Sequence, residues 1–161
     1  NNNSWCQNNL LGWMNWDSSQ QDLELLEYFK YIINIRKKLI KIFNPSQSFL
    51  PNNQNHENIP EYHWHGTKVN SPDWSSWSHT VAFSINKGKT NPVAWIGLNA
   101  YSKDIDFQLP KCKYNWLKVI DTSMSEIFEP LTINEKSVSI KSRSSLLIIS
   151  EEVFGAKNNL F

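Results

Sequence analysis

Two different hydrophobic periods divide the chain. Over residues 26–43, apolar residues recur at spacings of three and four, which is the pattern of one helical face. Over residues 80–85 the pattern alternates instead, with Val81, Phe83 and Ile85 on one side, which is typical of a half-buried strand. The pattern therefore predicts a helical segment followed by a β-rich segment.

The first segment is predicted to be a long amphipathic helix. Ser19 and Asp22 are spaced like a capping box at its start, and Asn44-Pro45 ends it. Arg36 lies on or beside the apolar face, and we favour a side chain that snorkels to solvent over a buried ion pair. The apolar stripe consists of Leu26, Phe29, Ile33, Arg36, Ile40 and Phe43, widened by Leu23, Ile32 and Leu39.

A polar stretch with three prolines follows at residues 44–60. Unstructured loops of this length are uncommon inside a compact domain, so the stretch predicts a domain boundary. We divide the chain into a first unit at residues 1–51, a linker at residues 52–60 and a second domain at residues 61–161.

The second domain is predicted to be all strands. Residues 64–77 are expected to form an ordered aromatic loop, and the continuously apolar residues 93–100 a central strand. Short strands separated by turns at roughly ten-residue spacing indicate an antiparallel sandwich. The predicted strands are residues 78–85, 93–100, 105–109, 116–120, 138–140 and 146–149, and the predicted core positions are Phe83, Ile96, Leu98, Phe107 and Ile148.

Composition limits the possible partners. The net charge is +1, with 16 basic and 15 acidic residues mixed along the chain, which gives no electrostatic case for nucleic acid or an anionic membrane. No apolar run is long enough to span a membrane. Two cysteines and no signal-peptide pattern favour a reduced, cytoplasmic setting. Because the chain starts with Asn1 rather than Met, we expect it to be part of a longer protein.

No self-contained active site is visible. His63 and His65 could hold a metal, but no third ligand has suitable spacing, so hydrogen-bonding roles are favoured. Asp104 and Asp106 could imitate a catalytic pair, but they lie on the polar side of an amphipathic strand and are interpreted as solvated surface. There is no Gly-rich phosphate loop. We therefore expect no catalytic residue, no metal and no cofactor in this chain.

The start of the chain is the best candidate for a binding site. Residues 1–17 are rich in asparagine and contain Trp5, Trp13 and Trp16. Asparagine offers both a donor and an acceptor, and tryptophan offers a flat apolar face, so the two together suit a sugar. The alternative is a loop that caps its own turns while its tryptophans pack in a core, and composition alone favours this alternative.

Four stretches, taken in order, resemble one family. The opening NNNSWCQNN and LLGWMNWD are similar to the Asn-Asn-x-Tyr-Cys-Gln-Asp-Asn…Trp-x-x-Trp segment of bacterial glycogen debranching enzymes and plant isoamylases, in glycoside hydrolase family 13. The helix LLEYFKYIINIRKKLIKIFNP resembles that family's Leu-Ile-x-Leu-Arg…His-Pro helix. WHGTKVNSPDWSSWSHTVAFSI resembles its Trp-His-Gly…Pro-Asp-Trp…Ser-x-x-Leu-Ala-Phe block, and NWLKVIDTS its Trp-x-x-Val-x-Asp-Thr block.

The chain departs from the family pattern at three positions. Trp5 stands where the family usually has Tyr, Asn8 where it usually has Asp, and Asn44 where it usually has His. The family's catalytic Asp nucleophile, Glu acid/base and transition-state Asp lie upstream of anything present here. The resemblance therefore supports a contact role for the opening loop, and no catalytic one.

The resemblance implies an α+β chain in which the last loop and helix of a catalytic (β/α)8 barrel precede an antiparallel β-sandwich. It implies a branched α-glucan as partner, an upstream catalytic portion, and a plastid setting if the source is a photosynthetic eukaryote. Two alternatives remain open: a stand-alone glucan-binding or regulatory module, and a decayed remnant. The implied substrate contacts are Asn2, Asn3, Trp5, Gln7 and Asn8.

Overall fold

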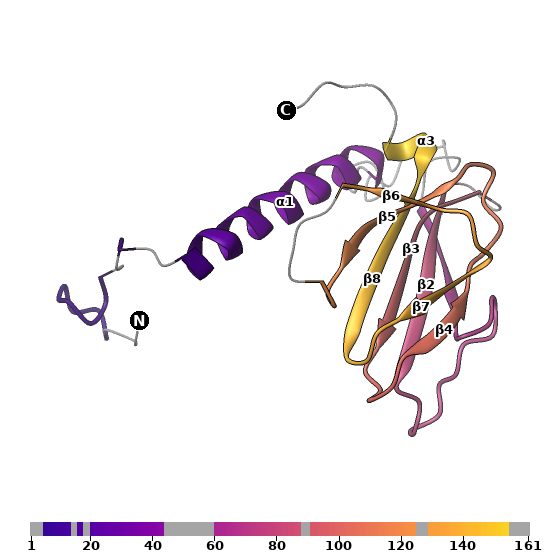
Figure 1. Ribbon diagram of the computed structural model, residues 1–161, viewed down its shortest axis with the longest axis horizontal. Coiled ribbons are helices and arrows are strands. Elements are labelled where there is room, and N and C mark those ends of the chain that lie inside the picture. The colour runs from indigo at the N-terminus through magenta and orange to yellow at the C-terminus, as the bar shows by residue number, and fades with distance from the viewer. Residues whose placement is uncertain are drawn as a thin grey trace, which may run out of the picture.

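The computed structural model describes residues 5–13, 16–17, 20–43, 60–87, 91–124 and 129–154. One long helix precedes eight strands and a short final helix within these residues (Figure 1). The elements are α1 (Gln20–Phe43), β1 (Pro60–His65), β2 (Thr80–Lys87), β3 (Asn91–Asn99), β4 (Ile105–Gln108), β5 (Trp116–Asp121), β6 (Leu131–Ile133), β7 (Ser137–Ile140), β8 (Ser144–Ser150) and α3 (Glu151–Phe154).

The strands form two antiparallel sheets. The larger sheet has the order β1-β2-β3-β8-β5-β6, and β4 pairs with β7 in a second, two-stranded sheet. The predicted antiparallel, sandwich-like arrangement is thus confirmed, and β3 lies inside the larger sheet as expected. Sequence reasoning missed β6 and β1; the latter contains His63, Trp64 and His65, where an irregular loop was expected to begin.

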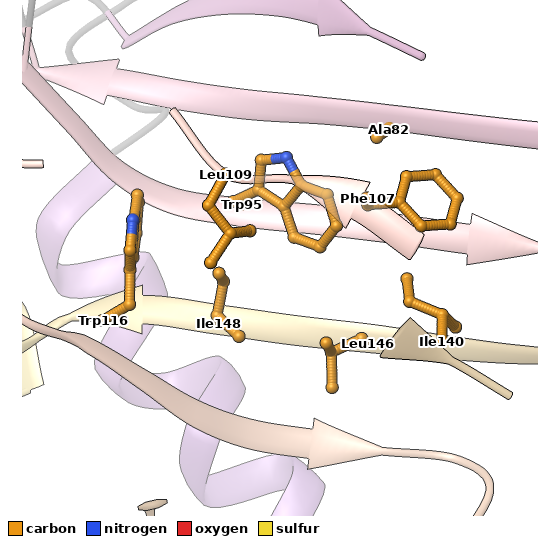
Figure 2. Packing of buried hydrophobic residues seen from close by; sticks show 8 residues of the cluster. All are labelled: Ala82, Trp95, Phe107, Leu109, Trp116, Ile140, Leu146 and Ile148. Carbon is orange, nitrogen blue, oxygen red and sulfur yellow. The ribbon is translucent and has the colours of Figure 1, made fainter. Parts of the chain in front are cut away.

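The main core fills the space between the two sheets. Trp95 on β3 and Phe107 on β4 make an edge-to-face contact, with ring centroids 5.9 Å apart, a favourable geometry for aromatic pairs. Figure 2 shows these rings with their neighbours from both sheets. The buried cluster consists of Ala82, Trp95, Phe107, Leu109, Trp116, Ile140, Leu146 and Ile148, so the predicted core positions Phe107 and Ile148 are confirmed.

The assignment of faces was wrong for Phe83, Ile96 and Leu98. Phe83 and Ile96 are only half-buried and Leu98 is 41% exposed, because all three lie on the outer face of the larger sheet, away from the second sheet. The inner face of β2 instead carries small and polar residues. These are Ala82, Ser84 and Asn86, all of them buried.

The large indole of Trp95 explains this inversion. Ser84 and Ala82 are the cross-strand neighbours of Trp95 and Gly97, so small side chains surround the ring. A Cβ atom on Gly97 would collide with the six-membered ring of Trp95 and with Ile140. The inner layer can hold Trp95 only because its neighbours on β2 and β3 are small, a volume constraint of close-packed cores.

A second, smaller core lies on the outer face of the larger sheet, beneath α1. Ile35 is only 4% exposed and packs with Leu117, Val119 and Ile149. The Tyr31 hydroxyl donates to the Val119 carbonyl oxygen at 2.5 Å. The sequence stripe missed Ile35: the stripe residues Leu26, Phe29, Ile33 and Ile40 are 45–54% exposed instead, and the Phe43 side chain lies outside the described residues.

The division into units at residues 52–60 stays a prediction, because only Pro60 of that linker belongs to the described residues. Arg36 is exposed, which agrees with a snorkelling side chain. Among the described residues, no helix combines the length and the apolar character that crossing a membrane requires.

Stability measurements on two phenylalanines test the face assignment. Phe107→Ala should lower the free energy of unfolding by about 3–5 kcal/mol, because it opens a cavity in a fully buried site. Phe83→Ala should cost less, roughly 1–2 kcal/mol, because its ring is only partly buried. Urea denaturation of the two variants checks the difference, and equal losses would contradict the observed faces.

Candidate functional site

The described part of the Asn-rich loop, residues 5–13, presents its predicted contact residues to solvent. Trp5 is 81% exposed, and Gln7 and Asn8 are exposed as well. Asn2 and Asn3 lie outside the described residues. The alternative in which the tryptophans of this region pack in a core is not what the described residues show, since Trp13 and Trp16 are 52% and 80% exposed.

Side chains of this loop also form hydrogen bonds with one another and with the loop backbone. The Trp13 indole N–H donates to Asn8 Oδ1 at 2.6 Å, and the Asn9 amide donates to Gln7 Oε1 at 3.0 Å. Asn9 Oδ1 in turn accepts the backbone N–H of Leu11 at 3.0 Å, an Asx-type turn. Asn8 Oδ1 accepts from Trp13, so the donors that Asn8 can offer a ligand are its amide N–H groups.

Two consecutive residues hold the loop in a left-handed backbone conformation. Trp5 has a φ of 50° and Cys6 a φ of 63°, values that non-glycine residues seldom adopt. Such strain costs on the order of 1–3 kcal/mol per residue and tends to occur where function requires a particular geometry. These two residues occupy the Tyr-Cys position of the family-like segment.

The chemistry of the loop is neutral. Residues 5–13 contain no ionisable side chain except Cys6, and they combine exposed indole rings with amide donors and acceptors. This arrangement can hydrogen-bond and stack with an uncharged polar ligand. It cannot supply the pair of carboxyl groups that glycoside hydrolysis requires. Sequence reasoning missed the Asn8–Trp13 bond, because a spacing of five residues in a loop carries no periodic signal.

The aromatic segment around β1 forms a second candidate. Trp64 makes an edge-to-face contact with Trp74 and a tilted contact with Phe83, each at a centroid distance of 5.3 Å. Asp73 Oδ1 accepts the backbone N–H of Ser75 at 3.0 Å and so fixes the turn that carries Trp74. The Trp-His-Gly…Pro-Asp-Trp pattern therefore has a local structural explanation.

Gly66 closes the same turn by close approach of backbone. A Cβ atom there would collide with the carbonyl oxygen of Ser71, so any larger residue would push the chain apart. The Gly66 N–H donates to the Lys68 carbonyl at 3.2 Å. The loop that follows β1 therefore turns back, and its backbone lies directly against Gly66 at the end of the strand.

His65 is buried on the inner side of this turn and fully hydrogen-bonded. Its Nδ1 accepts the backbone N–H of Asn70 at 2.9 Å, which places the proton on Nε2, 3.1 Å from Ser84 Oγ. Ser84 Oγ donates onward to Asn86 Oδ1 at 3.0 Å. Burial lowers the pKa of His65, and the nearby His63 lowers it further. The predicted hydrogen-bonding role of His65 is confirmed.

The Trp-x-x-Val-x-Asp-Thr-like block has a structural role of the same kind. Asp121 accepts hydrogen bonds from the Ser123 N–H and hydroxyl at 3.1 and 2.6 Å, and from Lys118 at 3.2 Å. Partial burial acts to raise the pKa of Asp121, but these hydrogen bonds outweigh it and lower the pKa. Thr122 Oγ1 accepts the Ser145 N–H at 2.8 Å, which ties the end of β5 to β8.

The two carboxylates that could imitate a catalytic pair, Asp104 and Asp106, lie on the surface. Asp104 is exposed and pairs with Lys141 at 2.8 Å, and Asp106 is exposed, which agrees with solvated surface. Hydrogen bonds from Lys141 and Ser142 lower the pKa of Asp104. Across the described ranges, no three His, Cys, Asp or Glu side chains gather as metal ligands would.

One shallow, open hollow of about 400 Å³ lies where β3, β5 and β8 end or begin. Its polar groups are hydroxyls, an amide and one guanidinium, so it contains no acid and base pair. The residues that line it are Leu98, Asn99, Ala100, Thr122, Arg143, Ser144 and Ser145.

The protonation of His65 should make stability depend on pH. Because the folded-state pKa lies below the ordinary value of 6.5, the stabilisation is complete above about pH 6.5. It should fall as the pH drops further, with a slope of at most about 1.4 kcal/mol per pH unit. The difference in unfolding free energy between the wild type and His65→Gln, measured from pH 8 to pH 5, should shrink; a constant difference would contradict the neutral, buried imidazole.

Three curated plant proteins are similar to this chain. Isoamylase 1, chloroplastic, of Oryza sativa subsp. japonica is 27% identical over 133 residues, which cover 82% of this chain and 15% of the relative. Isoamylase SU1, chloroplastic, of Zea mays and isoamylase 1, chloroplastic, of Arabidopsis thaliana are each 25% identical, over 82% of this chain and 16% of the relative. The chain therefore spans about one sixth of the length of these relatives.

The family model described as "Isoamylase 1-3, C-terminal" matches residues 63–154. That match begins in β1 and ends in α3, so it covers both sheets and more than half of the chain. It contains the Trp64–Trp74 contact, the His65 hydrogen bonds and the Asp121 turn described above. The chain belongs to the isoamylase C-terminal domain family.

Proposed function

We propose that this chain is the C-terminal portion of a hydrolase that cleaves α-1,6 branch linkages in a glycogen- or starch-like glucan. The observation that carries the proposal is the match of residues 63–154 to the isoamylase C-terminal family. The neutral, tryptophan-bearing loop at residues 5–13 supports it, because such a loop suits a sugar at the rim of a cleft.

The catalytic groups belong to another part of the protein in this proposal. A retaining glycoside hydrolase uses one carboxylate as the nucleophile and one carboxylic acid to protonate the leaving oxygen. The family resemblance puts these groups upstream of residue 1. This chain contributes the rim loop, in which exposed Trp5, Gln7 and Asn8, together with Asn2 and Asn3, contact the glucan.

We also propose that α1 is the last helix of the catalytic barrel. The exposed apolar side of α1, at Leu26, Phe29, Ile33 and Ile40, supports this assignment, since outer barrel helices bury such a stripe against strands and neighbouring helices. A plastid location follows from the chloroplastic names of the relatives, and it replaces the cytoplasmic setting as our proposal.

A stand-alone, non-catalytic glucan-binding module is the second candidate, and the exposed tryptophans of the loop favour it equally. The coding frame separates the two candidates. A frame that continues upstream with the family's catalytic carboxylates supports the enzyme, and a start codon at or near Asn1 supports the module or a decayed remnant.

Residues 1–161 alone should not hydrolyse branched glucan. The physical reason is that, within the part of the chain that the structure describes, no two carboxyl groups face each other as the reaction needs. Reducing ends released from glycogen by the purified chain, compared with a buffer blank, measure this directly. Release above the blank would contradict the proposal that catalysis resides upstream.

Trp5 should contribute to glucan affinity in the complete enzyme. Trp5→Ala should weaken binding by about 1–3 kcal/mol if the ring stacks on sugar, on the scale of aromatic–base stacking. The melting temperature should stay unchanged, because the ring is 81% exposed. Trp77→Ala, at 77% exposure and outside the Asn-rich loop, is the matched control and should leave the affinity unchanged. A lowered melting temperature with unchanged affinity would instead assign Trp5 a structural role.

A further inference from the structure

The turn between β7 and β8 holds an arginine in a backbone conformation that suits other residues better. Arg143 has a φ of 52°, a left-handed value that glycine and asparagine adopt most readily. Arginine therefore brings no conformational advantage to this turn. What it brings is its side chain, which lines the hollow at the ends of β3, β5 and β8.

The Arg143 guanidinium is available to a ligand. It is exposed, and no carboxylate in the described part of the chain pairs with it. Two acidic side chains at this end of the sheets are paired with lysines instead. Asp104 lies 2.8 Å from Lys141, and Asp121 lies 3.2 Å from Lys118. The planar fork of N–H donors on Arg143 can therefore bind two acceptors at once.

The hydroxyl groups of the hollow offer both acceptors and a donor. The Ser144 hydroxyl donates to the Lys141 carbonyl oxygen at 2.7 Å, so its oxygen can accept from a ligand. The Ser145 hydroxyl donates to Thr122 Oγ1 at 3.3 Å, so Ser145 can accept as well and the Thr122 O–H can donate. A sugar hydroxyl, which both donates and accepts, suits this mixture, whereas an oxyanion is bound best by donors alone.

The floor of the hollow is apolar. Leu98 is 41% exposed, and Ala100 is exposed as well. Tyr101 follows Ala100 directly and is 39% exposed, with its ring held edge-on by His79 at a centroid distance of 5.7 Å. The C–H face of a glucose unit can lie on such a floor while its hydroxyls reach the polar groups, the combination that specific ligand sites use.

The backbone around the hollow is held in place by one buried side chain. Asn99 Nδ2 donates to the carbonyl oxygens of Ile140 and Lys141, each at 3.0 Å. Asn99 Oδ1 accepts the Tyr101 N–H at 2.9 Å, and the Arg143 N–H donates to the Tyr101 carbonyl oxygen at 3.1 Å. The turn that carries Arg143 is thus fixed to the end of β3 before any ligand binds, which lowers the entropic cost of binding.

We propose that this hollow is a second contact site for α-glucan, separate from the Asn-rich loop. The Arg143 fork donates to two neighbouring hydroxyls of a glucose unit that lies over Leu98 and Ala100. The open form of the hollow, at about 400 Å³, suits a polymer that continues on both sides. Figure 1 shows that β8 begins at the end of the sheet away from α3, so the site lies far from the contact of α3 with α1. The inference rests on the proposed function for the identity of the sugar.

An NMR titration of the 161-residue chain with maltoheptaose locates the contact. Arg143→Asn should raise the Kd about tenfold, because hydrogen bonds from a charged group are lost. Asparagine tolerates the left-handed backbone, so the turn should keep its fold. Lys136→Asn removes the same charge at an exposed position between β6 and β7; it is the matched control and should leave the Kd unchanged. The backbone amides that should shift together are those of Leu98, Ala100, Thr122, Arg143 and Ser145.

Arg143→Lys separates a sugar site from an anion site. The substitution keeps the positive charge but loses the fork, so it should weaken maltoheptaose binding nearly as much as Arg143→Asn does. The wild-type shifts should persist in about 0.5 M NaCl, since a neutral ligand is insensitive to screening. Larger shifts of the same amides with inorganic phosphate, lost at that salt concentration, would overturn the proposal in favour of an anion site.

The protein produced from the complete coding frame gives the second readout. Arg143→Asn should raise its KM for glycogen several-fold, because only a long glucan can reach the cleft and the hollow together. Its kcat and KM for a short branched oligosaccharide should stay the same. An unchanged KM for glycogen would contradict a second contact.

The outcomes separate this inference from the proposed function. Amide shifts confined to residues 5–13 would overturn the inference and leave the proposed function standing, as would a wild-type Kd in Arg143→Asn. Shifts at the hollow that persist in Trp5→Ala and disappear in Arg143→Asn would support the inference. They would do so even if the complete protein cleaved no branched glucan, in which case the proposed function alone would fail.

Discussion

The burial of one indole ring determines which way the larger sheet faces. Trp95 is fully buried between the sheets and meets Phe107 edge to face. Its volume requires Gly97 beside it and the small side chains of Ala82 and Ser84 on the next strand. Because side chains alternate along a strand, Phe83 on β2 and Ile96 and Leu98 on β3 must then point outward. The inner core and the apolar residues on the outer face of the sheet are consequences of the same constraint.

The alternating pattern predicted the strands well but not their faces. Phe107 and Ile148 were placed correctly; the flanking residues of Phe107, Asp106 and Gln108, are polar and exposed, so its inward side is unambiguous. For Phe83 the same rule failed, since it assumes that one face of a strand meets water. Here both faces of the sheet carry apolar residues, and the inner one includes buried polar groups such as Asn99. These are tolerated because they are hydrogen-bonded: Asn99 Nδ2 donates to the Ile140 carbonyl oxygen at 3.0 Å.

Motif resemblance identified the family, whereas the roles of the motif residues required coordinates. Within Trp-His-Gly…Pro-Asp-Trp, Trp64 packs on Trp74, His65 bonds to Asn70 and Ser84, and Gly66 permits close backbone contact. Each of these contacts joins residues whose spacing has no helical or strand period, so no pattern in the sequence could indicate them. The same holds for the Asn8–Trp13 bond in the rim loop. Ile35 was missed for a different reason: α1 is apolar on more than one side, and periodicity cannot say which side a sheet will cover.

The two apolar sides of α1 connect the fold to the proposed function. One side closes the outer core through Ile35 and Tyr31, and the other leaves Phe29 and Ile33 half exposed. A helix that served only this sheet would gain nothing from the second stripe, because exposed apolar area contributes little stability and promotes association. The helix therefore has the composition of an element shared between two layers. In such an arrangement the rim loop, which lies just before α1 in the chain, is positioned by whatever fixes that helix, so the sheet domain can influence glucan contacts without contributing a catalytic group.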